Sequence, residues 1–211
     1  MQITSTNLSK PTTITWNGKT QQTGIFKTPT NMPIFLGKSG VQNDAVIDRK
    51  YHGGEFKACY LFSENQYGYW QDLYPNLDWD WGMFGENLTV KNLDETKIYV
   101  GDIYKIGNAI VQITEPREPC FKLGIRFGSQ SIIKQFIEHS FPGTYIRIIE
   151  EGTVEKGDVF QLIEKNTNSL TTAELFKLII SKEKNQNHLK LAINNEALPP
   201  KKRQQLEGFL K

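Results

Sequence analysis

IYKIGNAIVQI, residues 103–113, predicts two short strands joined by a tight turn at Gly107-Asn108. TTITWNG, residues 12–18, has the same form, and its Asn17-Gly18 pair favours the positive φ angles of a hairpin turn. Several hairpins in one chain favour a barrel or sandwich, because these folds leave few open sheet edges. We therefore predict a mainly β fold with some α, in the form of a β-barrel with peripheral helices.

Two further β-rich segments are YIRII, residues 145–149, and VFQLI, residues 159–163. They flank a turn-rich stretch, so we expect them to pair as a third hairpin. Two helices interrupt the strands, and each is indicated by apolar residues at helical spacing. A helix over residues 63–73 carries Tyr67, Trp70 and Leu73 at this spacing, and a later helix carries Ile132, Ile133, Phe136 and Ile137. We assign the aromatic residues and the isoleucines to the core.

The character of the chain changes after Lys165. A polar break precedes Thr171-Thr172-Ala173-Glu174, which has the spacing of a capping box and predicts the start of a helix. Two more short helices are expected, near residues 188–193 and from Pro199 or Pro200 to Leu210. We therefore divide the chain into a β-barrel domain, residues 1–165, and a small C-terminal three-helix domain, residues 166–211.

The charge of the chain is nearly balanced, with 25 Lys and Arg against 23 Asp and Glu. This balance argues against a general nucleic-acid surface. Solvated helix faces explain the mildly basic C-terminal segment, although a nucleic-acid role stays open there. The N-terminus has no leader-like pattern, and no apolar run is long enough to span a membrane. We expect a cytoplasmic protein.

The two cysteines, Cys59 and Cys120, are too few for the usual four-thiolate iron–sulfur cluster. No zinc motif and no glycine-rich dinucleotide fingerprint is present either. An intracellular chain gives no reason to pair the two thiols, so we expect no disulfide. The sequence therefore contains no recognisable redox cofactor site of these kinds.

Cys120 lies in EPREPCFKL, residues 115–123, where the chain favours an ionised thiol. We expect Pro119 to start a helix whose free N–H groups point at the sulfur, and Arg117 and Lys122 add positive charge nearby. Both effects favour the thiolate, which serves either as a nucleophile or as a soft metal ligand. A buried, inert core thiol is the alternative reading from the residues alone.

DRKYHGGEFK, residues 48–57, has the composition of an anion-binding site. Basic or protonatable side chains surround a Gly-Gly pair that lets backbone N–H groups approach a ligand: Arg49, Lys50, His52 and Lys57 around Gly53 and Gly54. A tight turn and a structural histidine are the alternatives.

GMFGENLT, residues 82–89, is a glycine-punctuated loop that leads into a strand. Asn87 offers a donor and an acceptor to a heterocycle, and Glu86 is expected to hold a basic neighbour rather than to lie beside a phosphate. A plain turn between strands is the default interpretation of this loop.

Taken in order, four motifs resemble the MOSC domain, the molybdenum cofactor sulfurase C-terminal family: His-Gly-Gly-x-x-Lys, Phe-Gly-Glu-Asn-Leu, Gly-Asp-x-Tyr and Pro-Arg-x-Pro-Cys-x-Lys-Leu. The resemblance is closest to the stand-alone, YiiM-like bacterial members, which also carry a C-terminal three-helix domain. It covers essentially the whole chain. The sequence departs from the family pattern at Phe121, where many relatives show tryptophan, at Asn43 and at Cys59.

The resemblance implies a β-barrel that binds the molybdenum cofactor, Mo-molybdopterin, a pterin with a dithiolene and a terminal phosphate. Cys120 would then ligate molybdenum, with Arg117 and Lys122 beside the metal-bound end, and Asn87 would lie near the heterocycle. The residues implied near the phosphate or pterin are Arg49, His52, Gly53, Gly54 and Lys57.

The resemblance further implies an enzyme that reduces N-hydroxylated compounds, such as hydroxylaminopurines or amidoxime-like substrates, to amines. Electrons would come from a separate flavin or iron–sulfur reductase. Two other functions stay open: a non-enzymatic carrier of the cofactor, and a sulfur carrier or covalent nucleophile that uses Cys120 with His52 as its base.

Overall fold

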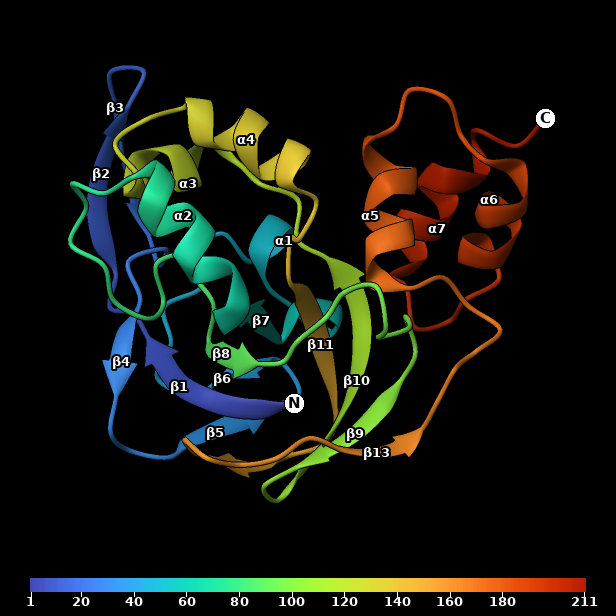
Figure 1. The fold of residues 1–211 in the computed structure, drawn as a ribbon, viewed down its shortest axis with the longest axis horizontal. Coiled ribbons are helices and arrows are strands. Elements are labelled where there is room, and N and C mark those ends of the chain that lie inside the picture. Colours follow the sequence, from blue (N-terminus) through green and yellow to red (C-terminus); the bar gives the residue numbers. More distant parts are fainter.

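The computed structural model describes the backbone of residues 1–211 and all side chains except those of Lys50 and Tyr51. A curled sheet, two smaller β-sheets and seven α-helices make up the described backbone (Figure 1). The strands are β1 Gln2–Leu8, β2 Thr12–Trp16, β3 Lys19–Thr23, β4 Thr28–Thr30, β5 Ile34–Gly37, β6 Gly40–Val41, β7 Cys59–Ser63, β8 Leu88–Lys91, β9 Ile103–Ile106, β10 Ala109–Pro116, β11 Thr144–Glu150, β12 Gly152–Val154 and β13 Gln161–Glu164. The helices are α1 Arg49–His52, α2 Tyr67–Leu73, α3 Phe121–Arg126, α4 Ser131–His139, α5 Thr172–Ile180, α6 Gln186–Ile193 and α7 Pro200–Glu207, with 3₁₀ turns at Glu55–Lys57 and Glu64–Gln66.

The large sheet has eight strands in the order β13-β9-β10-β11-β7-β8-β1-β4. Only the β7–β8 pair is parallel within it. The sheet curls until β1 meets the segment before β13: the Ile3 N–H donates to the Asp158 carbonyl at 2.9 Å, and the Phe160 N–H donates to the Met1 carbonyl at 3.0 Å. The result is a half-barrel with an apolar interior, so the predicted mainly β class with peripheral helices is confirmed.

Two of the three predicted hairpins form. The β2–β3 turn has positive φ at both Asn17 (49°) and Gly18 (73°), and the β9–β10 turn has positive φ at Gly107 (53°). The third prediction is wrong, because β11 pairs with β10 and β7, whereas β13 pairs with β9. The intervening β12 pairs with β5 in a separate three-stranded sheet, and the chain then reaches β13 at one edge of the large sheet. The pairing of β13 with β9 joins strands that are far apart in the sequence, so the turn residues do not indicate it.

Helices α2, α3 and α4 cover one side of the half-barrel and share a second apolar core (Figure 1). Tyr67 and Trp70 are buried in it, as expected, whereas Leu73, the third apolar residue at that spacing, is 43% exposed at the end of α2. Helix α3 begins at Phe121, with Cys120 at its N-cap position. Pro119 therefore precedes the helix and does not start it, contrary to the sequence prediction.

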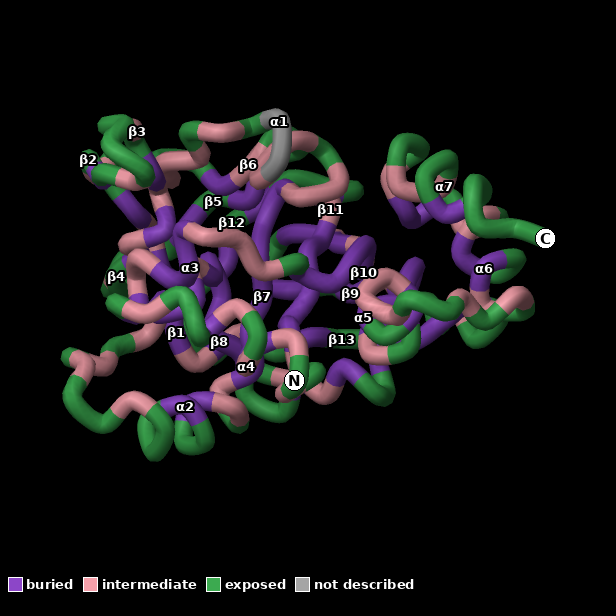
Figure 2. The backbone as a smooth tube through the Cα atoms, turned by 90° about the horizontal axis from the view of Figure 1, so that it is seen from above, coloured by how far each residue is buried: buried purple, intermediate pink, exposed green. Residues whose placement is uncertain are grey.

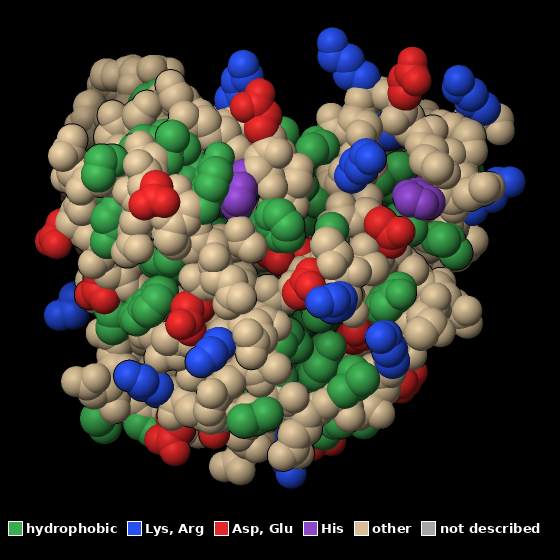
Figure 3. Space-filling model, viewed as in Figure 1, with side chains coloured by type: hydrophobic (Ala, Val, Ile, Leu, Met, Phe, Trp, Pro, Cys, Tyr) green, Lys and Arg blue, Asp and Glu red, His purple; other side chains and the backbone are tan. Residues whose placement is uncertain are grey.

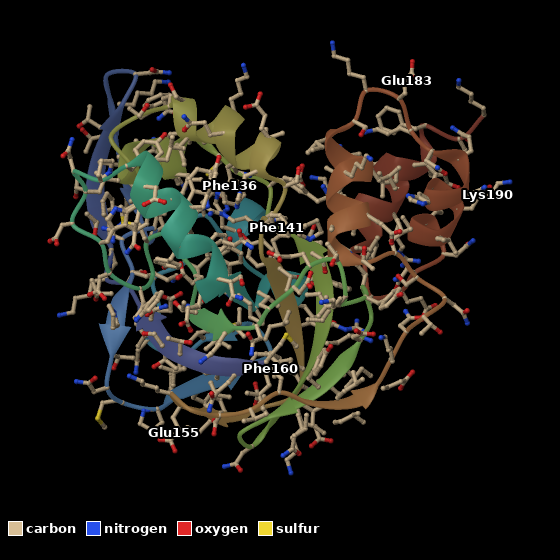
Figure 4. All side chains as sticks on the ribbon, viewed as in Figure 1. Phe136, Phe141, Glu155, Phe160, Glu183 and Lys190 are labelled. Atoms are coloured by element: carbon tan, nitrogen blue, oxygen red, sulfur yellow. The ribbon has the colours of Figure 1, made fainter. Side chains whose placement is uncertain are left out.

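The last three helices, α5 to α7, surround a core cluster of their own, to which the barrel contributes Val100. Figure 2 shows this buried interior separated from that of the half-barrel, and in Figure 4 the labelled Glu183 and Lys190 lie on the outer side of the bundle. The predicted capping box is present: the Thr171 hydroxyl accepts from the Glu174 N–H at 3.2 Å, and the Glu174 carboxylate accepts from the Thr171 N–H at 2.8 Å. The domain boundary at residue 165 stays a prediction.

Replacing Thr171 with alanine is expected to lower the free energy of unfolding by about 1 kcal/mol, because one N–H of the first turn of α5 loses its acceptor. Urea unfolding of Thr171→Ala and of the wild type measures this change. Thr167→Ala is the matched control, since Thr167 is exposed in the preceding turn. Equal loss of stability in both variants would contradict a capping role.

Glu95 ties the half-barrel to the C-terminal helices. It is fully buried; its carbonyl accepts from the Ala173 N–H at 2.9 Å, and its carboxylate accepts from the Gly143 N–H at 2.9 Å. The second carboxylate oxygen has no hydrogen-bond partner among the described residues. Burial raises the pKa of Glu95 from its ordinary 4.5 to about 7.

Glu95→Gln is expected to make stability less dependent on pH. Because the pKa is higher in the folded chain, folding favours the protonated carboxyl, and this stabilisation is lost as pH rises from 4.5 through about 7. The wild type should therefore lose up to about 3 kcal/mol between pH 5 and pH 8 through this group, and the variant should not. Urea unfolding at both pH values, with the exposed Glu196→Gln as control, tests this. A pH dependence unchanged in Glu95→Gln would refute it.

None of the helices in the described part of the chain is both long and apolar enough to cross a bilayer. Figure 3 shows basic and acidic side chains interspersed on the face that it presents, and a notch between the half-barrel and the C-terminal helices.

Candidate functional site

A pocket at one side of the half-barrel brings together three segments that lie far apart in the sequence. Segment 117–122 follows β10 and leads into α3, segment 48–57 contains α1 and a 3₁₀ turn, and Asn87 immediately precedes β8. Six of the nine residues selected from the sequence line this pocket: His52, Lys57, Asn87, Arg117, Cys120 and Lys122.

Cys120 and His52 face each other in this pocket, with the sulfur 3.7 Å from Nε2 of the ring. Burial lowers the pKa of His52 to about 4, and the positive charges of Lys122, Arg117 and Lys57 add to this effect. The imidazole is therefore neutral at pH 7 and presents one nitrogen as an acceptor. Which ring nitrogen carries the proton depends on the tautomer.

Three cationic side chains surround the thiol. Nζ of Lys57 lies 3.6 Å from the carboxylate of the buried Glu115, and Nζ of Lys122 lies 3.8 Å from Oδ2 of Asp48. Lys122 and Arg117 are each only 6% exposed. The three positive charges exceed the two carboxylates that pair with them, so this end of the pocket favours a negatively charged ligand.

Arg117 carries the clearest sign of a missing partner. Its guanidinium lies over the ring of Tyr60, 5.1 Å from the centroid, and over that of Phe136 at 5.6 Å. These rings hold the group in place, but Nη1 is buried and has no hydrogen-bond partner among the described residues. Because buried donors are normally satisfied, this atom is an available donor for an anion in the pocket.

The other end of the pocket contains an ion pair that sequence reasoning missed. Lys27 pairs with Asp44, whose carboxylate also accepts from the Asn87 amide at 2.9 Å and from the Ser9 N–H at 2.9 Å. Burial lowers the pKa of Lys27, and the carboxylate of Asp44 opposes that shift. The only indication of this ion pair in the sequence was a lysine directly after the apolar pair Ile25-Phe26.

Close backbone packing between Gly24 and Ala45 fixes one wall of the pocket. Gly24 lies against Ala45, and a Cβ on Gly24 would be 1.6 Å from the Ala45 carbonyl oxygen. Both residues line the pocket. Glycine is required here by space, not by an unusual φ angle.

The remaining three predicted residues lie outside the pocket lining. Arg49 donates to the Ser39 carbonyl, and neither Gly53 nor Gly54 is among the lining residues. Gly54 has φ of 95°, which explains the glycine by backbone conformation. Lys50, which was counted with the basic side chains of this segment, lies outside the described side chains.

Glu86 has a different role from the one that we expected. Its carboxylate accepts from the Gly82 N–H at 2.9 Å, from the Phe84 N–H at 3.1 Å, and from the hydroxyls of Tyr67 and Thr89. It therefore holds the loop 82–89 in shape through neutral donors instead of a basic neighbour. Asn87 is likewise occupied, since its amide bonds Asp44 and its carbonyl oxygen accepts from the Tyr60 N–H.

This arrangement can bind an anion and offer it a thiol. The donor set consists of one partly exposed sulfur and three cations, one of which, Arg117, has a guanidinium nitrogen without a hydrogen-bond partner among the described residues. This set suits a phosphate-bearing ligand with a soft metal at one end. The residues present therefore fit the molybdenum cofactor. Fold and site together define a half-barrel protein with a thiol at the edge of a cationic pocket.

The chain belongs to the MOSC domain family, whose family model matches residues 48–161. YflK of Bacillus subtilis is 30% identical over 196 residues, which cover 93% of this chain and 88% of that protein. A protein of Gibberella moniliformis named as a reductase is 33% identical over 144 residues, covering 67% of this chain but 26% of the relative. The crystal structure of YiiM from Geobacillus stearothermophilus superposes with a TM-score of 0.83 and 30% identity, covering 100% of this chain and 99% of that one.

Proposed function

We propose that this protein binds the molybdenum cofactor and reduces N-hydroxylated compounds, such as hydroxylaminopurines or amidoximes, to amines. The observation that carries the proposal is the pocket in which Cys120 adjoins three cations and the unpartnered Nη1 of Arg117. Membership of the MOSC family and similarity to a relative named as a reductase support it.

Each residue has a defined part in this proposal. Cys120 would supply a sulfur ligand, and Arg117, Lys57 and Lys122 would hold the anionic part of the cofactor. When bound, the cofactor supplies a metal that exchanges oxygen and electrons with a substrate. The cations also stabilise negative charge that develops during cleavage of the N–O bond, and their burial strengthens this effect.

The reaction consumes two electrons and two protons: R–NHOH becomes R–NH₂, and the oxygen leaves as water. The electrons would come from a separate flavin or iron–sulfur reductase, because the two cysteines of the chain cannot hold a four-thiolate cluster. The identity of this partner is part of the proposal.

The test is to purify the protein from a host that makes the cofactor, and to measure molybdenum, pterin and turnover of 6-hydroxylaminopurine with a reduced electron donor. About one molybdenum and one pterin per chain, together with formation of the amine, is the expected result. Metal and pterin without any turnover would instead identify a cofactor carrier. Folded protein without either would reject the cofactor function.

The contact between Cys120 and His52 favours a second candidate function, a sulfur carrier or covalent nucleophile. At 3.7 Å, Nε2 is placed to accept the thiol proton, which is the first requirement for a Cys–His pair. His52→Ala should then abolish alkylation of Cys120 by iodoacetamide at neutral pH in metal-free protein. Unchanged alkylation would exclude His52 as the base.

A further inference from the structure

Asp48 brings a carboxylate into the cationic end of the pocket. Its Oδ2 lies 3.8 Å from Nζ of Lys122, and it lines the same pocket as Arg117 and Cys120. Asp48 occupies the N-cap position of α1, yet its side chain makes no capping hydrogen bond there. An aspartate at an N-cap position normally accepts a hydrogen bond from the first turn of its helix. The side chain of Asp48 instead lies near Lys122.

The two carboxylates among the described lining residues, Asp44 and Asp48, differ in how firmly they are held. Asp44 has 1% side-chain exposure and accepts from Ser9, Lys27 and Asn87. Asp48 has 40% side-chain exposure and a single long ion pair. Because its side chain is 40% exposed, the Asp48 carboxylate can turn to solvent when an anion takes its place beside the buried Lys122.

We propose that Asp48 determines which anions the pocket accepts, by competing with them for Lys122. A small anion such as inorganic phosphate must displace this carboxylate or tolerate its charge, and it has few other contacts with which to offset the repulsion. An organic phosphate that also reaches Arg117 and Cys120 gains further interactions and displaces the Asp48 carboxylate. The inference rests on the proposed cofactor site and adds a specificity-determining residue to it.

The competition follows from simple electrostatics. Two like charges about 4 Å apart repel each other even at the dielectric constant of water, and more strongly near a protein surface. Removing the Asp48 charge while keeping the size of its side chain should therefore tighten binding of inorganic phosphate about ten-fold. The gain should depend on Lys122, because that lysine is the group that Asp48 neutralises.

The experiment measures the Kd of inorganic phosphate by calorimetry at fixed ionic strength, with the full-length chain from a host that cannot make the cofactor. The variants are Asp48→Asn, Lys122→Met and the double variant. Asp72→Asn is the matched control, because it removes the same charge from an exposed position on α2. We expect about ten-fold tighter binding in Asp48→Asn only, and loss of that gain in the double variant.

Two results would overturn the inference. Equal phosphate binding by Asp48→Asn and Asp72→Asn would show that Asp48 does not compete, and an undiminished gain in the double variant would show that Lys122 is not its target. Neither result affects the cofactor proposal, which fails separately if the protein from a competent host lacks molybdenum and pterin. Urea unfolding of every variant confirms that the fold is intact.

Discussion

Cys120→Ala is expected to lower the molybdenum content at least ten-fold in protein purified from a host that makes the cofactor. The sulfur of Cys120 is the soft ligand that the pocket offers, and changes even to groups behind a metal ligand commonly reduce metal affinity ten- to hundred-fold. Pterin content should fall less, since Arg117, Lys57 and Lys122 still bind its anionic part. Metal by mass spectrometry and pterin by fluorescence of its oxidised form are the two measurements.

Cys59→Ala is the matched control for this experiment. Cys59 is 1% exposed within β7, and burial raises the pKa of its thiol, so it stays a neutral core residue. The variant should keep its molybdenum and lose about 1 kcal/mol of stability through the small cavity. Retention of metal in Cys120→Ala, or its equal loss in both variants, would remove Cys120 from the role of ligand.

Gly24→Ala is expected to have the largest effect on stability, a loss of about 3 kcal/mol or more. The added Cβ would stand 1.6 Å from the Ala45 carbonyl oxygen, so the segment that carries Asp44 must move outward. This movement separates Asp44 from Lys27 and leaves a buried lysine without its counter-ion, which is costly. Urea unfolding measures the loss, and limited proteolysis reports the displaced segment.

Gly68→Ala separates this steric effect from the general consequences of replacing glycine. Gly68 lies inside α2, and a Cβ there would meet no atom within 4 Å. Alanine should stabilise this helix by about 0.5–1 kcal/mol. A Gly24→Ala variant as stable as the wild type, with an intact pocket, would contradict the close packing described between Gly24 and Ala45.

Local signals predicted the elements that local interactions determine. Asn17-Gly18 and Gly107 set two hairpin turns through their own backbone conformation, and the capping box at Thr171 depends on residues three apart. The β11–β13 pairing failed because strand partners are chosen by the whole sheet. The exposure of Leu73 has the same cause. Helical spacing indicates which face of a helix can be buried, but the elements packed around the helix decide where burial ends.

The candidate site was predictable where motif residues also face the pocket. Cys120, Arg117 and Lys122 lie on one short segment, so their proximity could be inferred from the sequence alone. Lys27 and Asp44 could not be placed, because the fold brings them to the pocket from separate segments, whereas Asp48 belongs to the segment 48–57 that was selected from the sequence. Arg49 was selected for its charge, although the structure uses that charge to bind a carbonyl.

Closure of the half-barrel constrains how the chain can fold during synthesis. β1 meets residues 157–160 through backbone hydrogen bonds, so its final partners leave the ribosome only after about three quarters of the chain has been translated. Until then one edge of β1 has no partner, and contacts between residues far apart in the sequence form slowly. Nascent chains stalled before residue 157 should therefore recruit chaperones, and those stalled after the barrel segment has emerged should release them.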